Sequence, residues 1–345
     1  MTARNLFSKH TLIGFAFLFC AARGFAQMPD TLQSIFEHLT ASEGAKITLE
    51  ADLTTIIANK KTNQYFPGTL ITEDGKTYAI ELRPRGKFRR KISEIPPLKI
   101  KFKKKLLAAE GLDTLNEIKL VLPTVDKASG DELVIKEYLA YKMFERLTPA
   151  SVRAKLIKLT IRDTHVEKSK KTMYAILVED EEETCARLKG SPVSEYGIPT
   201  DSLIAHQAAL SVMFEYMIGN TDWEIAMMRN VRLMRSNETG KVLVMPYDFD
   251  FSGLVSAPYA SPSSESGLKT VRDRFLMSSG LKLEHLKRAT QVIRAAKKDL
   301  YEICRSKYLS KTTSGEMIDY LDTFFQMVET KDEVPTTLLM PVVGE

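Results

Sequence analysis

The chain has 345 residues, of which 44% are hydrophobic and 27% are charged. This composition is typical of a globular protein that can bury a large core. With 49 basic and 44 acidic residues the net charge is +5, and a balance this close gives no reason to expect nucleic acid or an anionic membrane as a partner.

Residues 1–26 have the three-part pattern of a cleavable secretory signal, with a cut expected before Gln27. The pattern consists of a basic leader, an apolar stretch and small residues before the cut: Arg4, Lys9, residues 11–22, Gly24 and Ala26. The apolar stretch is too short to cross a bilayer core of about 30 Å at 1.5 Å per residue. We therefore expect an exported protein in the periplasm, at the cell surface or outside the cell, with no membrane-spanning segment after processing. Because the signal carries three basic residues and no acid, the processed chain would have a net charge of +2.

Residues 27–180 are expected to form a β-rich lobe with one long helix. A short helical lead-in is predicted over residues 27–45, and later segments alternate apolar and polar side chains as strands do. The predicted strands are residues 47–53, 65–72, 77–82, 98–102, 117–121, 153–162 and 172–179. A turn at residues 73–76 predicts a hairpin. Helical spacing predicts a helix from about residue 130 to Thr148, which Pro149 would end.

Residues 181–345 are expected to form a mainly helical lobe. An amphipathic helix is predicted over residues 203–218, and the following Gly219-Asn220 is a typical helix end. A polar loop then carries Asp222. The rest of the lobe is predicted to contain two short strands, the acidic segment that follows them, and helices: residues 230–235, 241–245, 246–253 and 271–330.

This order of elements is the order found in protein kinases, in which a β-rich lobe with one helix precedes a helical lobe. In a kinase, a loop supplies the acid that faces the acceptor, and a hairpin leads to a metal-binding Asp before Phe-Gly. Five segments of the chain resemble those of the CotH kinase-like family, named for a spore coat protein, and the resemblance covers about residues 80–255. The segments are residues 83–90, 98–102, 136–142, 218–223 and 246–253.

The resemblance implies an α+β, atypical protein-kinase-like fold of two lobes within residues 27–345. It also implies that the chain uses ATP with Mg²⁺ and transfers the γ-phosphate to an exported or surface protein. Asp222 is then the predicted catalytic residue, because it lies on the loop where a kinase places the acid that accepts or orients the acceptor proton.

The predicted metal ligands are Asp248, Asp250 and Asn230. Asp248 and Asp250 flank Phe249, so an extended segment would place both carboxylates on one side. Two converging carboxylates repel each other unless a cation lies between them, and Mg²⁺ prefers oxygen ligands. Which of the two is the main ligand stays open. Asn230 follows Asp222 by eight residues, whereas ordinary kinases place the metal-binding Asn five residues after the catalytic Asp.

A kinase also needs a lysine that contacts the phosphates and a helix glutamate that holds it. Lys101 and Glu137 are the predicted nucleotide-binding residues. Lys99 shares the polar strand face with Lys101, and Lys119 is a rival because its strand directly precedes the long helix. Glu137 has apolar neighbours on its helix face, where an acid needs a cationic partner.

The β-rich half has no Gly-x-Gly-x-x-Gly loop, and the basic cluster at residues 83–91 is either its replacement or a solvated loop. The cluster lacks the aromatic interleaving of a nucleic-acid stacking surface, so nucleic acid is not expected.

Two other functions stay open from the sequence. A metal-dependent glycosyltransferase also uses an Asp-x-Asp pair after an apolar strand, but it predicts early parallel βαβ units. A catalytically inactive kinase fold acting as a scaffold at the cell envelope is the second. Cys185 and Cys304 remain after processing, and an exported compartment would permit a disulfide between them.

Overall fold

The computed structural model describes residues 32–125 and 128–330. The predicted signal peptide and the cut before Gln27 lie outside the described residues. The first element is helix α1 (Ile35–Leu39), where Ser34 and Glu37 form a capping box that satisfies N–H groups of the first turn. This helix falls within the lead-in predicted for residues 27–45.

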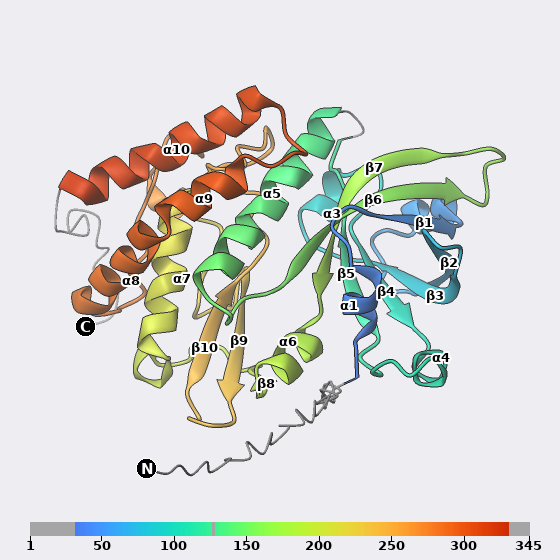
Figure 1. The fold of residues 1–345 in the computed structure, drawn as a ribbon, viewed down its shortest axis with the longest axis horizontal. Helices are drawn as coiled ribbons and strands as arrows, with labels where there is room; N and C mark the ends of the chain where they lie inside the picture. The colour runs from blue at the N-terminus through green and yellow to red at the C-terminus, as the bar shows by residue number, and fades with distance from the viewer. Residues whose placement is uncertain (1–31, 126–127, 331–345) are drawn as a thin grey trace, which may run out of the picture. The chain divides into compact units, whose positions relative to one another are not determined.

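Seven strands form a closed barrel in the order β1-β2-β3-β4-β5-β7-β6 (Figure 1). All neighbouring pairs are antiparallel except β1 and β6, which run parallel. The strands are β1 (Ala45–Ala51), β2 (Phe66–Thr72), β3 (Thr77–Pro84), β4 (Leu98–Phe102), β5 (Glu117–Val121), β6 (Ala154–Asp163) and β7 (Lys171–Glu179). Their alternating apolar side chains fill one hydrophobic cluster. The sequence predicted these strands but not the closure, because β1 and β6 lie far apart in the chain.

Three short helices lie in the connections between barrel strands, and the sequence analysis predicted none of them. They are α2 (Leu53–Ala58), α3 (Arg89–Ile92) and α4 (Lys104–Ala109). Helix α3 belongs to the basic segment, where Phe88 is 43% exposed and the side chain of Arg89 is only 7% exposed. The basic segment is therefore not a uniformly solvated loop.

Helix α5 (Ala128–Leu147) confirms the long helix predicted up to Thr148. It contacts strands β6 and β7 on one side and helix α9 (Lys297–Cys304) on the other (Figure 1). Because it is covered from both sides, it buries polar residues such as Glu137 together with its apolar ones. The helix thus connects the barrel to the helical half of the chain.

The second half is mainly helical and contains a three-stranded sheet of order β10-β9-β8. Its elements are α6 (Glu181–Arg187), β8 (Gly190–Pro192), α7 (Ala205–Ile218), β9 (Val231–Ser236), β10 (Val242–Pro246), α8 (Leu283–Ala295) and α10 (Lys311–Thr330). The hairpin of β9 and β10 agrees with the predicted one, whereas the edge strand β8 was not predicted. Within the described ranges, no helix is long and apolar enough to cross a membrane. Cys185 and Cys304 are both buried and both free thiols, so the structure does not contain the disulfide that the sequence left open.

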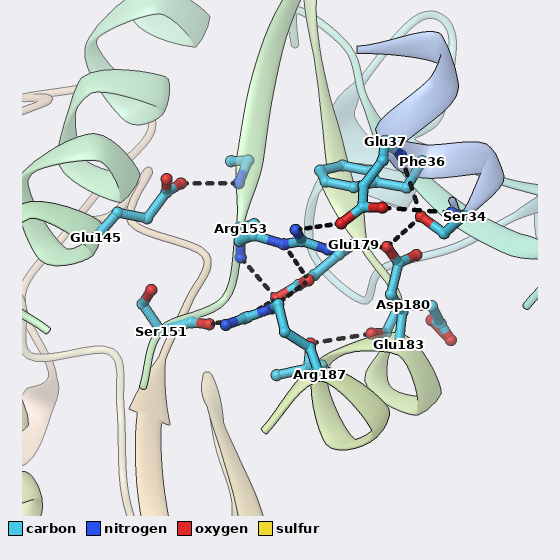
Figure 2. Close-up of polar contacts among 12 residues, drawn as sticks. Ser34, Phe36, Glu37, Glu145, Ser151, Arg153, Glu179, Asp180, Glu183 and Arg187 are labelled. Atoms are coloured by element: carbon cyan, nitrogen blue, oxygen red, sulfur yellow. Dashed lines mark hydrogen bonds and ion pairs between the residues drawn. The ribbon is translucent and has the colours of Figure 1, made fainter. Parts of the chain in front are cut away.

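An ionic network joins α1, the strands β6 and β7, and α6 (Figure 2). Arg153 contacts Glu37 at 2.8 Å, Glu179 at 2.8 Å and Glu183 at 2.9 Å. The hydroxyl of Ser34 donates to Glu183 Oε1 at 2.6 Å. The network fixes the connection from β7 to α6, where the β-rich half leads into the helical half.

Candidate functional site

The guanidinium of Arg89 lies among three carboxylates. Its Nη1 and Nη2 atoms donate to the two oxygens of Glu137 at 2.8 and 3.0 Å. Its Nε lies 3.2 Å from Asp250 Oδ2, and Nη2 also pairs with Asp248. Bidentate pairing of this kind fixes both distance and orientation. Arg89, on helix α3 between two barrel strands, therefore links helix α5 to the segment that follows β10.

The basic segment (residues 83–91) contacts the acidic segment (residues 246–253) through aromatic rings as well as through charged groups. The ring of Phe88 lies 5.2 Å from that of Phe251 and 6.0 Å from that of Tyr259. The hydroxyl of Tyr259 donates to Asp250 Oδ2 at 3.1 Å. These contacts explain why Asp250 is buried, with 4% of its surface exposed.

The two aspartates converge, but not by the extended geometry that the sequence predicted. Strand β10 ends at Pro246, and Asp248 has a left-handed backbone with φ 66°. A non-glycine residue in this region carries strain, which is frequent at functional sites. The backbone N–H of Asp248 donates to the hydroxyl of Tyr141 at 2.9 Å and so holds this conformation. The expected alternation was wrong, yet both carboxylates reach the same guanidinium.

In the cluster, three carboxylates face the single guanidinium of Arg89. Burial raises the pKa of Asp250 well above its ordinary value, and burial also raises the pKa of Glu137. Burial acts against ionisation of Asp248 too, but the charges of Arg89 and Arg85 bring its pKa below the ordinary value. A cation placed at Asp248 and Asp250 would favour the ionised form of both carboxylates.

Two carboxylates suit Mg²⁺ in particular, because this ion keeps several waters and takes its other ligands from substrate phosphates. The side chain of Asp248 is 28% exposed, so one of the two acids is accessible from solvent. Among the described residues, no group of three or more His, Cys, Asp or Glu side chains is placed to hold a metal ion. A magnesium ion at Asp248 and Asp250 would therefore require oxygen ligands from water or substrate.

Asp222 and Asn230 meet on the loop that follows α7. The amide of Asn230 donates to Asp222 Oδ2 at 2.9 Å and to the carbonyl of Asp222 at 2.6 Å. Arg229 Nε lies 3.8 Å from Asp222 Oδ1, and the side chain of Asp222 is 36% exposed. Burial raises the pKa of Asp222, and the charge of Asp248 raises it further. The structure thus brings Asn230 to the predicted catalytic acid, and the carbonyl of Asn230 accepts a hydrogen bond at 3.0 Å from the N–H of Tyr247, directly before Asp248. The metal-binding role of Asn230 stays a prediction.

The loop after α7 and the segment after β10 are held together by backbone hydrogen bonds. Helix α7 ends at Gly219, whose φ of 66° is the left-handed conformation that favours glycine. The N–H of Gly253 donates to the carbonyl of Gly219 at 3.0 Å, and the next N–H, of Leu254, donates to Ile218 at 3.0 Å. These bonds keep the two acidic segments side by side.

The predicted lysine does not reach the helix glutamate. Lys101 Nζ lies 3.8 Å from Glu117 and is 39% exposed, whereas Glu137 is paired with Arg89. Lys99 pairs with Glu117 as well. Lys101 thus has no contact with Glu137, whereas Lys99 also lies 3.4 Å from Asp180 and is the cross-strand neighbour of Lys119 on β5.

Lys119 on β5 lies nearer to the aspartates than Lys101 does. Its Nζ is 5.3 Å from the ring centre of Tyr247, which directly precedes Asp248, and 3.8 Å from Asp180. Burial lowers the pKa of Lys119 well below its ordinary value, and the charge of Arg232 lowers it further. The rival named in the sequence analysis therefore has the better position.

Sequence analysis missed Arg89 as a separate functional residue. It lies in a run of six basic residues, Arg83, Arg85, Lys87, Arg89, Arg90 and Lys91, and composition does not distinguish the one that points inward. The sequence did indicate that such a residue must exist, because Glu137 lies on an apolar helix face and a buried acid requires a cationic partner. Only the fold reveals that α3 supplies it.

No family model matches the chain, and no curated protein matches it. Among solved structures, the chain is similar to the crystal structure of the Helicobacter pylori proinflammatory kinase CtkA. That alignment has 10% sequence identity and a TM-score of 0.39, and it covers 65% of this chain and 88% of that chain. Values this low establish neither a shared family nor a shared activity.

Proposed function

We propose that the chain is an exported atypical protein kinase of the CotH-like kind, which transfers the γ-phosphate of ATP to a hydroxyl of an exported or surface protein. The observation that carries this proposal is the convergence of Glu137, Asp248 and Asp250 on Arg89. The charge of Asp248 also raises the pKa of Asp222. In protein kinases a helix acid pairs with a basic residue near the phosphates, and a separate acid after a hairpin holds Mg²⁺. Here Arg89 brings a helix acid next to the acidic segment that follows the β9–β10 hairpin.

In this proposal Asp248 and Asp250 hold Mg²⁺, and the nearby basic side chains of Lys119 and Arg85 bind phosphates. Lys119 takes the role that the sequence analysis gave to Lys101. Mg²⁺ bound there would neutralise charge on the transferring phosphate. Arg89 keeps the acids in place, since four of its N–H contacts go to carboxylates.

Asp222 is proposed to act on the acceptor. The acceptor oxygen forms a bond to the γ-phosphorus, the bond from that phosphorus to the bridging oxygen of ADP breaks, and the hydroxyl proton passes to Asp222. A raised pKa suits an acid that takes up a proton, and Asn230 orients the carboxylate through its amide.

The proposal also covers the organisation of the chain. Residues 1–26 would be removed as a signal peptide, and residues 27–345 would act as one exported domain. Its β-rich lobe would span residues 27–180 and its helical lobe residues 181–345.

The test is phosphate transfer from labelled ATP with Mg²⁺, to the chain itself and to a set of exported proteins. Asp222→Asn should transfer phosphate about 10²–10⁴-fold more slowly, because it loses general-base assistance. It should bind ATP nearly as well as the parent, because Asp222 is not one of the two acids that we assign to the metal. Equal transfer rates for parent and variant would remove Asp222 from catalysis.

A catalytically inactive scaffold is the second candidate, and one observation favours it. Arg89 already pairs with both aspartates that the metal would need. In that case the parent would not transfer phosphate from ATP to any acceptor. The glycosyltransferase alternative predicted parallel βαβ units, and the described barrel instead has antiparallel neighbours everywhere except the β1–β6 pair.

A further inference from the structure

An apolar groove lies beside the loop that carries Asp222. It has a cavity volume of about 360 Å³, and its lining includes the apolar side chains of Leu203, Ile225, Phe275 and Met277. This volume falls in the range of about 300–1,000 Å³ that is typical of ligand sites. The groove is thus large enough to hold two or three side chains of a peptide.

Hydrogen bonds attach the walls of the groove to the predicted catalytic loop. The N–H of Ser263, which lines the groove, donates to the hydroxyl of Thr221 at 2.9 Å, directly before Asp222 in the chain. The N–H of Gly197 donates at 2.9 Å to the carbonyl of Ala226, which lines the groove. A segment bound in the groove would therefore lie next to the acid that we assign to the acceptor.

Two large apolar side chains that lie close in the chain to the lining residues Ile198 and Ala226 are exposed. Tyr196 is 69% exposed and Met227 is 58% exposed, and each is the chain neighbour of one residue of the Gly197–Ala226 hydrogen bond. Apolar side chains exposed beside a groove are typical of interaction surfaces.

The charged residues that line the groove, among those the structure describes, are both acidic: Glu224 and Glu265. Glu224 lies 3.5 Å from Arg229, which compensates its charge. Glu265 is exposed and has no ion pair within the described part of the chain. The groove therefore offers an apolar floor and one uncompensated carboxylate at its rim.

We propose that this groove binds the acceptor protein through a segment with an apolar side chain and a basic one. The proposal rests on the proposed function, since it names the class of acceptor that such a kinase would select. The apolar side chain would be buried on Phe275 and Met277, and the basic one would pair with Glu265. A charged residue at the rim of an interface contributes more to specificity than to affinity.

Binding of fluorescein-labelled peptides to the purified chain, measured by anisotropy without ATP, tests the proposal. One peptide contains Ser, Thr and Tyr acceptors flanked by Leu and Arg, and the second has Glu in place of Arg. The basic peptide should bind about tenfold more tightly, and Glu265→Lys should reverse the preference. Reversal rather than loss would also show that the variant is folded. Glu238→Lys, in the exposed turn between β9 and β10, is the matched charge control and should leave the preference unchanged.

Equal binding of the two peptides, or an unchanged preference in Glu265→Lys, would overturn the proposal. Tighter peptide binding after truncation at residue 330 would also overturn it, because it would make the chain's own C-terminal segment the occupant. Phosphate transfer is measured separately. Transfer without peptide preference refutes the groove and leaves the kinase function standing, whereas preference without transfer refutes the kinase function and leaves the groove as a peptide-binding site.

Discussion

At the scale of single residues, the stability of the acidic cluster depends on Arg89. A buried charge that loses its partner is strongly unfavourable, whereas the intact pair contributes little by itself. Arg89 compensates three acids at once, two of which have raised pKa values because of burial. The cluster is therefore sensitive to the loss of one side chain.

We predict that Arg89→Met lowers the free energy of unfolding by about 3–5 kcal/mol, because it leaves buried carboxylates without a counter-charge. Urea denaturation measures the change. Lys87→Met removes a basic residue from the same segment, but Lys87 is exposed and should change stability by less than about 0.5 kcal/mol. Equal stability of the two variants would contradict the assigned role of Arg89.

Glu183 predicts a dependence of stability on pH. Burial raises its pKa to about 7, and the charge of Glu179 adds to this effect although Arg153 opposes it. Its Oε2 atom is buried without a hydrogen-bond partner in the described structure, and this is the oxygen on which a proton fits. In the unfolded chain the same group ionises near its ordinary value of 4.5.

Between these two pKa values the folded state binds more protons than the unfolded state, so the stability due to Glu183 falls as pH rises. The stabilisation is complete below pH 4.5 and is lost by about pH 7. Over this window the parent should lose on the order of 3 kcal/mol relative to Glu183→Gln, which cannot ionise. Denaturation of both proteins at pH 4.5, 5.5, 6.5 and 7.5 measures the difference, and parallel profiles would refute the shift.

At the scale of elements, helix α10 packs against both acidic segments through one tyrosine. A Cβ placed on Gly219 would lie 2.0 Å from the hydroxyl of Tyr320, and a Cβ on Gly253 would lie 2.2 Å from it. The same hydroxyl donates to the carbonyl of Arg272 at 3.2 Å, so it is not free to move away. The close contact between these elements requires glycine at both positions.

We predict that Gly253→Ala destabilises the chain by about 1–3 kcal/mol, because the added methyl also meets the carbonyl of Val271 at 2.7 Å. Adding Tyr320→Phe should recover part of the loss, since it removes the hydroxyl. Gly315→Ala, within α10, has no atom within 4 Å of the added Cβ and should stabilise the helix by up to about 1 kcal/mol. Thermal unfolding of the three variants tests this, and a neutral Gly253→Ala would show that the contact is loose.

The elements themselves were largely predictable because their signals are local. Alternation predicted the strand of residues 98–102, whose apolar side chains are buried in β4, and the Gly219-Asn220 pair marked the end of α7. The short helix α3 was not predictable, because four residues rich in arginine have neither a cap nor an apolar face. The partner of Glu137 was missed for that reason.

At the scale of the whole molecule, closure of the barrel and assembly of the site depend on contacts between distant parts of the chain. The parallel β1–β6 pair and the pairing of Arg89 with Asp248 leave no trace in local periodicity. The order of elements still predicted that Asp222, Asp248 and Asp250 would lie on neighbouring segments. The sequence could therefore identify the acidic residues of the site, but it could not identify the basic residue that pairs with each of them.

The last prediction concerns stabilisation of the whole chain by its proposed ligand. A ligand that binds only the folded state raises the free energy of unfolding by RT ln(1 + [L]/Kd), which is about 2.7 kcal/mol at 100 times Kd. ATP with Mg²⁺ should therefore raise the thermal midpoint of the parent, and ATP with EDTA should raise it much less. The effect should disappear in the double variant Asp248→Asn with Asp250→Asn, which loses two of the acids that we assign to the metal. That variant should still fold, because Arg89 retains both hydrogen bonds to Glu137.

The matched control for this experiment is Asp201→Asn with Asp319→Asn, which removes two exposed acids away from the cluster and should keep the full ATP shift. Calorimetric titration then converts the shift into an affinity. A magnesium-dependent shift that survives in the double variant would place the metal elsewhere in the chain. A parent that ATP does not stabilise at any Mg²⁺ concentration would refute the nucleotide site itself, and with it the kinase function, since transfer requires that ATP binds the folded chain.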